Sequence, residues 1–304
     1  MSGGVATAGA KPRHARAGGA RRRLDLVSAY LRLHGTLVYL FLYVPILIVI
    51  VYSFNDSRYV LSWGGVSLRW YEAAWTDSQV LNPLKTSLIV AVVTTVISTI
   101  LGTLAALAIA RAPRPARLVF DALIYTALIV PEVVIALASL LFLNGLFGLL
   151  QGAGVRITFG IPTIVAGHVL FNLSLVILIV RARIAGMDRA LIEASGDLFA
   201  SPWRTFVQVT LPQLTPAIIA GALLSFTFSM DDVVISTFLS GVGSTTLPMR
   251  VFSMIRFGVT PAVNAISSVM LALTLVAIVV AQWLVRRAGR QPSGAELVEA
   301  VAGA

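Results

Sequence analysis

The sequence predicts an all-α integral membrane protein with six transmembrane helices. Hydrophobic residues make up 58% of the 304 residues and charged residues only 12%, against roughly 45–50% and 25% in soluble globular chains. The mean hydropathy is +0.90. Six stretches reach the length of about 20 mostly apolar residues that spans a bilayer. The sequence does not show the repeated segments of about ten residues with alternating polarity that a membrane β-barrel needs.

The six predicted spans alternate with polar loops. The third and fifth contain acidic residues: Asp121 and Glu132 in the third, Asp231 and Asp232 in the fifth. The predicted bounds are Thr36–Phe54, Ser87–Ala110, Leu118–Leu143, Pro162–Val180, Thr215–Leu239 and Asn264–Val285.

Basic residues predict the orientation. Most of the 23 lysines and arginines lie in the N-terminal tail, the loops after the second and fourth spans, and the C-terminal tail. Cytoplasmic loops carry such an excess, so we expect both termini in the cytoplasm. The expected organisation is a basic, disordered cytoplasmic tail over 1–34, a transmembrane region over 35–286 and a second cytoplasmic tail over 287–304. No aromatic residue interleaves the first tail's arginines, which argues against nucleic-acid binding.

The loop over 181–214 is predicted to be an ordered cytoplasmic knob. Met187–Phe199 has Leu191, Ala194 and Leu198 on one helical face. Ser201 and Pro202 then form a strong helix start, since serine caps a helix and proline fits its first turn. This second short helix is expected to run to Thr210, before Pro212 and the fifth span.

The same loop carries a spaced motif. It reads Glu193-Ala194-Ser195, three residues, Phe199, nine residues, and then Val209, Thr210, Leu211 and Pro212. This resembles the EAA motif of permease subunits in ABC importers that work with a substrate-binding protein. Phe199 stands where the motif has glycine. Because phenylalanine does not easily take a positive φ, we expect the bend to be built differently, with Phe199 adding an apolar contact.

The resemblance extends over about 35–286. Leu101–Ala106, ending at Arg111, is similar to the second-span signature of these permeases, and Trp63–Tyr71 is similar to their first outer loop. Ser225–Ser236, with its Ser-Met-Asp-Asp run, is close to the fifth span of one branch. That branch is the second permease subunit of spermidine/putrescine importers.

The resemblance implies the type I ABC importer permease fold in a bacterial inner membrane. It implies a second permease subunit, two ATPase subunits and a periplasmic or extracellular binding protein as partners. ATP and magnesium would be held by the ATPase, and this chain would have no catalytic residue, metal or cofactor. Its two lysines, Lys11 and Lys85, do not follow a glycine, so a P-loop is absent. The expected ATPase contacts are Glu193, Ala194, Ser195, Leu198, Phe199, Ala200, Leu211 and Pro212.

Charged residues within membrane spans are costly and mark candidate solute sites. Glu132, Asp231 and Asp232 lie at similar predicted depth, where carboxylates would attract a cation. Asn172, near mid-depth in the fourth span, is predicted to add a neutral hydrogen bond to the pathway. Adjacent aspartates point about 100° apart on a helix, so we expect one to face the pathway.

The other aspartate is expected to cap the backbone or to pair with Arg250 or Arg256. A structural role is the alternative for all three acids, with Pro131 before Glu132 as a kink. His168 is predicted to serve packing or hydrogen bonding.

Other functions stay open at this stage. An ABC permease for ferric ion, thiamine or an anion keeps the same fold, although anions fit poorly with three acidic positions and no basic residue within the spans. A secondary transporter would use the acids as proton or sodium sites. The EAA spacing argues against that alternative, because a secondary transporter has no ATPase to dock. A membrane-embedded enzyme is the least favoured, since no nucleophile–base pair is evident.

Overall fold

The computed structural model describes residues 18–59, 62–154, 156–188, 190–256, 258 and 260–288. Within these residues the secondary structure is helical, apart from an isolated bridge between Asn55 and Val66. The helices are α1 (Gly18–Ser53), α2 (Arg69–Thr76), α3 (Ser78–Arg111), α4 (Arg114–Ile129), α5 (Glu132–Gly152), α6 (Ile161–Ala185), α7 (Ala190–Asp197), α8 (Pro202–Thr205), the π-helical turn η1 (Phe206–Thr210), α9 (Leu211–Asp231), α10 (Val234–Leu239), α11 (Leu247–Arg256) and α12 (Pro261–Ala288).

Six helical segments of the described chain are long and apolar enough to cross a membrane, as the sequence predicts. They are Val27–Ser53, Ser78–Arg111, Glu132–Gly152, Ile161–Ala185, Pro202–Asp231 and Pro261–Leu284. Each overlaps one predicted span. The all-helical, six-span fold class is therefore confirmed.

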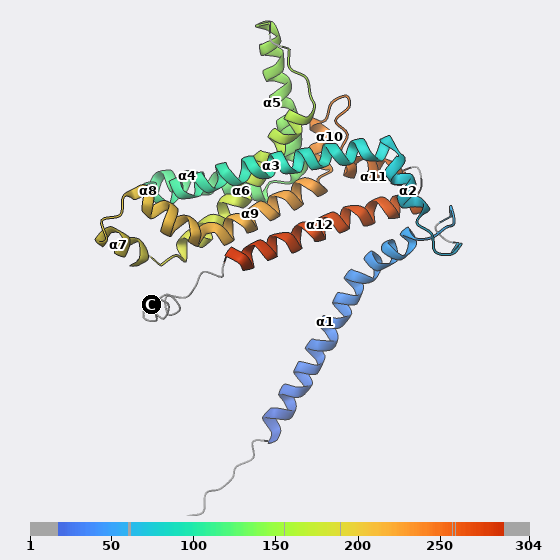
Figure 1. Ribbon diagram of the computed structural model, residues 1–304, viewed down its shortest axis with the longest axis horizontal. Coiled ribbons are helices and arrows are strands. Elements are labelled where there is room, and N and C mark those ends of the chain that lie inside the picture. The colour runs from blue at the N-terminus through green and yellow to red at the C-terminus, as the bar shows by residue number, and fades with distance from the viewer. Residues whose placement is uncertain are drawn as a thin grey trace, which may run out of the picture. The chain divides into compact units, whose positions relative to one another are not determined.

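The predicted bounds of the third span, Leu118–Leu143, are wrong. The helix ends at Ile129, and a new helix begins at Glu132 in a different direction (Figure 1). Pro131 causes the break, because proline lacks an N–H and disfavours helical φ/ψ in the residue before it. Val130 is accordingly extended, with φ −63° and ψ 131°. A single predicted span thus becomes α4 and α5.

The predicted fifth span, Thr215–Leu239, is also divided. Its helix starts earlier, at Leu211, with Pro216 inside it, and stops at Asp231. Asp232 is extended, with φ −66° and ψ 130°. The short helix α10 follows. This second break lies at the acidic residues and positions the candidate site.

The chain divides after Val51 into two units. The described part of the first unit belongs to α1, which begins at Gly18 and therefore extends through part of the tail predicted over 1–34. Arginine, leucine and alanine favour a helix, and no proline interrupts residues 18–34. The remainder of both predicted tails, residues 1–17 and 289–304, lies outside the described residues.

The second unit is a bundle in which α3, α6 and α9 pack against one another and α12 packs on α9 (Figure 1). Close approach depends on small residues. A side-chain Cβ at Gly102 on α3 would lie 2.7 Å from Cγ1 of Val176 on α6, and one at Gly221 on α9 would lie 3.4 Å from the same atom. Glycine thus lets both helices pack on Val176, which is fully buried.

Helices α7 and α8 lie at one end of this bundle, hereafter the EAA end, and α2, α10 and α11 lie toward the other (Figure 1). The guanidinium Nε of Arg183, near the end of α6, donates to the backbone oxygen of Gln213 at 2.9 Å. Arg181 forms an ion pair with Asp121 of α4. Asp121, which the sequence places in the third predicted span, is thus connected to α6.

Candidate functional site

Asp232 ends one helix and starts the next. Its carboxylate Oδ1 accepts from the backbone N–H of Ile235 at 3.1 Å, and Oδ2 accepts from that of Ser236 at 2.7 Å. A side chain that satisfies the free N–H groups at the start of a helix stabilises that start. The prediction that one aspartate caps the backbone is confirmed, and Asp232 is the residue that does so.

His168 joins α6 to both sides of this helix break. Its side chain is 1% exposed. The ring Nδ1 lies 2.7 Å from Ser229 Oγ of α9, and Nε2 lies 2.9 Å from Asp232 Oδ2 and 3.2 Å from Ser236 Oγ of α10. The predicted hydrogen-bonding role of His168 is confirmed. Its partners lie more than 60 positions away, and sequence spacing does not identify them.

Two further residues of α6 contact α10. The hydroxyl of Thr163 donates to the backbone oxygen of Leu239 at 2.7 Å. Gly167 allows close packing, because a Cβ at this position would lie 2.4 Å from Leu239 Cδ1 and 2.6 Å from Ile235 Cγ2. Together with His168, these residues hold α10 against α6 along its whole length.

Asp231 is oriented differently from its neighbour. It lines a cavity of about 390 Å³ between α9, α11 and α12. No hydrogen bond or ion pair connects its carboxylate to another residue of the described chain. The two candidate arginine partners are engaged elsewhere: Arg250 hydrogen-bonds to Gln79, and Arg256 lies 4.9 Å from the ring centre of Phe252.

Glu132 completes an acidic cluster. It is the first residue of α5, where the helix dipole favours a negative charge. Its carboxyl lies beside that of Asp232 and within electrostatic range of Asp231. The structure therefore brings together the three carboxyls that the sequence places at similar depth, and it does so at the two helix breaks. In the described chain, no three His, Asp or Glu side chains are arranged to hold a metal ion.

Asn172 does not line the cavity beside Asp231. It is 2% exposed and lies one turn after His168 on α6. Its Nδ2 donates to the backbone oxygen of His168 at 3.0 Å, and its Oδ1 has no partner among the described residues. In this conformation Asn172 faces the packed interior between helices rather than a cavity.

The EAA loop folds into two short helical segments joined by a tight bend. The first helix, α7, is shorter than the predicted Met187–Phe199 segment. The side chain of Ser195 is buried and hydrogen-bonds to Thr205 Oγ1 of α8 at 2.9 Å. Ser201 caps α8 by accepting from the N–H of Arg204, as predicted. The second segment then continues without interruption through η1 into α9, so Leu211 and Pro212 begin a membrane helix rather than a linker.

The prediction that Phe199 does not take a positive φ at the bend is wrong. Phe199 has φ +56°, so it adopts the left-handed conformation that glycine takes most easily. The N–H of Ala200 donates to the oxygen of Ser195, and that of Phe199 to the oxygen of Gly196. These are the two hydrogen bonds of a Schellman C-cap. Their formation offsets the strain of a non-glycine residue at this position.

The bend leaves apolar side chains at the surface. Phe199 is 97% exposed and Leu198 is 81% exposed. Glu193 and Ala194 also lie on the surface of α7, whereas Ala200 is half-buried. Four of the eight residues predicted to contact an ATPase are thus exposed, Ala200, Leu211 and Pro212 are half-buried, and the buried Ser195 instead connects the two short helices.

The fold and site define a membrane permease component. Residues 98–290 match the family model described as the inner membrane component of binding-protein-dependent transport systems. The chain belongs to this family.

Several curated relatives cover most of the chain. It is 38% identical over 252 residues to the putrescine transport system permease protein PotI of Escherichia coli strain K12, covering 83% of this chain and 89% of PotI. It is 36% identical over 251 residues to the spermidine/putrescine transport system permease protein PotC of the same organism, covering 83% of this chain and 92% of PotC. The PotC protein of Haemophilus influenzae is 36% identical over 250 residues, with 82% and 94% covered.

Solved structures confirm the fold. A bacterial ABC transporter involved in the import of the acidic polysaccharide alginate has a chain that matches with a TM-score of 0.71 at 17% identity, over 88% of this chain and 99% of that one. A bacterial alginate ABC transporter in complex with an alginate pentasaccharide-bound periplasmic protein matches with a TM-score of 0.71 at 17% identity, over 89% of this chain and 97% of that one. The ABC importer permease fold that the EAA resemblance implies is therefore confirmed.

Proposed function

We propose that the chain is the permease subunit of an ATP-driven importer that moves polyamines such as putrescine and spermidine across the bacterial inner membrane. The observation that carries this proposal is the cluster of Glu132, Asp231 and Asp232 at two breaks in membrane helices. The names of the PotI and PotC relatives support the same solute class.

The chemistry of the cluster suits a flexible cation with several positive charges. Such a solute must lose much of its water in a narrow pathway, and fixed carboxylates offset this cost because charge attraction strengthens as water is excluded. Asp231 has no protein partner in the described structure and is the carboxylate most available to solute. Asp232 is held by His168 and by α10.

The transport energy would come from other subunits. We propose a second permease subunit, two ATPase subunits that hold ATP and magnesium, and an external binding protein that delivers the solute. The exposed knob of α7, with Glu193, Leu198 and Phe199, would dock on the ATPase. The excess of arginine in the N-terminal tail, in the loops after the second and fourth predicted spans and in the C-terminal tail supports a cytoplasmic location for the knob and for both termini.

The experiment that tests this function is uptake into vesicles that contain the complete complex with ATP inside and binding protein outside. We expect ATP-dependent uptake of radiolabelled putrescine or spermidine. We also expect unlabelled polyamine to compete and ferric ion, thiamine and sulfate not to compete. Competition by one of those three solutes together with absent polyamine uptake would contradict the proposal and favour another cargo.

A further inference from the structure

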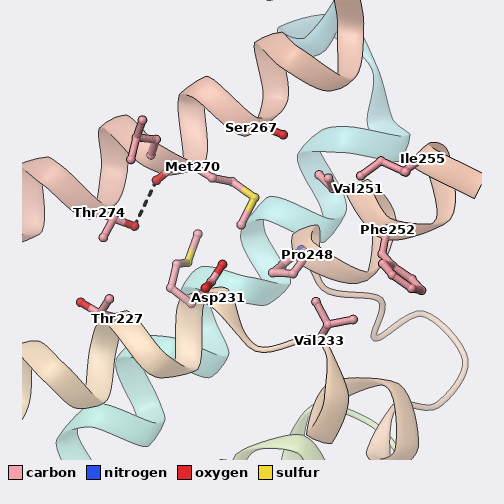
Figure 2. Close-up of a pocket in the computed structure, with 12 residues that line it drawn as sticks. Thr227, Asp231, Val233, Pro248, Val251, Phe252, Ile255, Ser267, Met270 and Thr274 are labelled. Carbon is pink, nitrogen blue, oxygen red and sulfur yellow. Dashed lines mark hydrogen bonds between the residues drawn. The ribbon is translucent and has the colours of Figure 1, made fainter. Parts of the chain in front are cut away.

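The cavity beside Asp231 is built from three helices. Its lining residues are Thr227, Met230, Asp231, Val233, Pro248, Val251, Phe252, Ile255, Ser267, Met270, Leu271 and Thr274. In Figure 2 the Asp231 side chain points into the space between α9 and α12, toward Met270. The volume of about 390 Å³ falls within the range of small-molecule sites. Asp231 is the one ionisable residue in this described lining.

Apart from the Ser267 hydroxyl, which can both donate and accept, the polar side chains that line the cavity are left as hydrogen-bond acceptors. The hydroxyl hydrogens of Thr227 and Thr274 are donated to the backbone oxygens of Leu223 at 2.9 Å and Met270 at 3.1 Å. Each hydroxyl oxygen therefore has only acceptor capacity left for a ligand. An ionised Asp231 carboxylate is likewise an acceptor. A primary ammonium group, which has three donors and no acceptor, complements this set.

The remaining walls are apolar and polarisable. Met230 and Met270 contribute thioether side chains, which adapt to the shape of a bound group. Val251, Ile255 and Leu271 add aliphatic surface. An inorganic cation gains nothing from such walls. A chain of methylene groups attached to an ammonium gains from each one removed from water.

The charged residues near Asp231 have other partners, so its carboxylate is free to bind an ammonium group. Asp232 already accepts from two backbone N–H groups and contacts His168. Arg250 is bound to Gln79, and Arg256 lies over the ring of Phe252 at the cavity's edge. Neither arginine forms an ion pair with Asp231 among the described residues.

We propose that this cavity binds one end of a linear aliphatic amine within a single permease subunit, with the ammonium on Asp231 and the methylene chain against Met230, Met270 and Leu271. The cavity would thereby select among amines by chain length. This inference rests on the proposed function, and it adds the residues that would determine specificity. Met270 and Ser267, both on α12, are the positions where a change in side-chain size should alter the selected length.

The test is competition for labelled putrescine uptake by 1,3-diaminopropane, putrescine and cadaverine, which differ by one methylene each, in vesicles with the complete complex. Met270→Ala widens the cavity and should favour the longer amine. Ser267→Leu narrows it and should favour the shorter one. One methylene in an apolar pocket changes selectivity by about tenfold or more. Leu275→Ala is the control, since Leu275 lies on the same helix, is 52% exposed and does not line the cavity.

The outcomes distinguish failure of the cavity proposal from failure of the proposed transport function. Opposite shifts in chain-length preference for Met270→Ala and Ser267→Leu, with none for Leu275→Ala, support the cavity. Normal putrescine uptake with an unchanged preference in both cavity variants would overturn the cavity proposal alone. No amine uptake by the wild-type complex would contradict the proposed function and this inference with it. Gel filtration of each complex shows whether a variant is assembled before its selectivity is interpreted.

Discussion

His168 Nε2 and Asp232 Oδ2 lie 2.9 Å apart in a buried contact between α6 and the break that separates α9 from α10. The contact connects a membrane helix to the cap of the next short helix. It fixes Asp232 and, through the backbone, sets the direction in which Asp231 points. The two adjacent aspartates thereby acquire different roles: one holds the fold, and the other faces a cavity.

Replacing His168 by leucine should destabilise the protein. It leaves Ser229, Ser236 and the Asp232 carboxylate without their imidazole partner, and an unsatisfied buried polar group costs about 1–3 kcal/mol. His168→Gln, which keeps an amide that can donate and accept, should lose less. Thermal unfolding in detergent would measure the order wild type, His168→Gln, His168→Leu. Equal midpoints for all three would show that the contact contributes no stability.

Gly167→Ala should loosen α10 without changing any charge. The new methyl group would collide with Leu239 and Ile235, and overpacking of this kind costs about 1–3 kcal/mol. Gly148→Ala on α5 is the matched control, because a Cβ there meets nothing within 4 Å. Hydrogen exchange of the α10 amides is the measurement. Faster exchange is expected for Gly167→Ala only, and equal protection in both variants would contradict tight packing at Gly167.

Phe199→Gly should stabilise the bend after α7. A non-glycine residue at φ +56° carries a cost of about 1–2 kcal/mol, which glycine removes, although glycine also gains freedom in the unfolded chain. A net gain of at most about 1 kcal/mol is expected, with the ATPase still bound. Phe199→Ala keeps the backbone cost and removes the ring. If neither variant bound the ATPase, the exposed ring of Phe199 would be an essential contact with the ATPase, and the prediction that the ring is dispensable would be wrong.

Glu193→Arg should disrupt coupling. Glu193 lies on the exposed surface of α7, and reversing its charge should weaken docking of the proposed ATPase while leaving membrane insertion intact. The control is Glu72→Arg, a charge reversal at an exposed position of α2, away from the EAA end (Figure 1). Solute-stimulated ATP hydrolysis by the reconstituted complex is the readout. Normal stimulation and transport in Glu193→Arg would refute a coupling role for this residue.

Much of this structure could be predicted from composition and spacing. Apolar length predicts the number of spans, and the EAA spacing predicts a folded loop that the structure contains. The depth argument predicts that Glu132 and the two aspartates lie together, although they come from different helices. These features depend on local patterns whose physical meaning does not change with tertiary context.

The helix breaks were harder to predict because apolar content measures length and not continuity. Pro131 indicates the first break, since proline restricts the backbone of the residue before it. At Asp232 the signal is weaker: an aspartate can cap a helix or lie within one. The contact with His168 determines that Asp232 caps α10. This contact forms only when distant segments of the chain pack together. Phe199 is a case in which two Schellman hydrogen bonds and exposure of the ring outweigh an unfavourable backbone preference.

The central claim is that the Asp231 carboxylate meets the transported cation. The measurement is ATP-driven uptake of radiolabelled polyamine by vesicles containing Asp231→Asn, beside basal ATP hydrolysis on the same preparation. Asp232→Asn and Glu132→Gln serve as parallel variants in assembled complexes.

We expect Asp231→Asn to reduce uptake about tenfold, which corresponds to about 1.4 kcal/mol in a rate-limiting step, while basal hydrolysis persists. A wild-type uptake rate in Asp231→Asn would contradict this claim, and wild-type rates in all three neutral variants would show that the whole acidic cluster is structural.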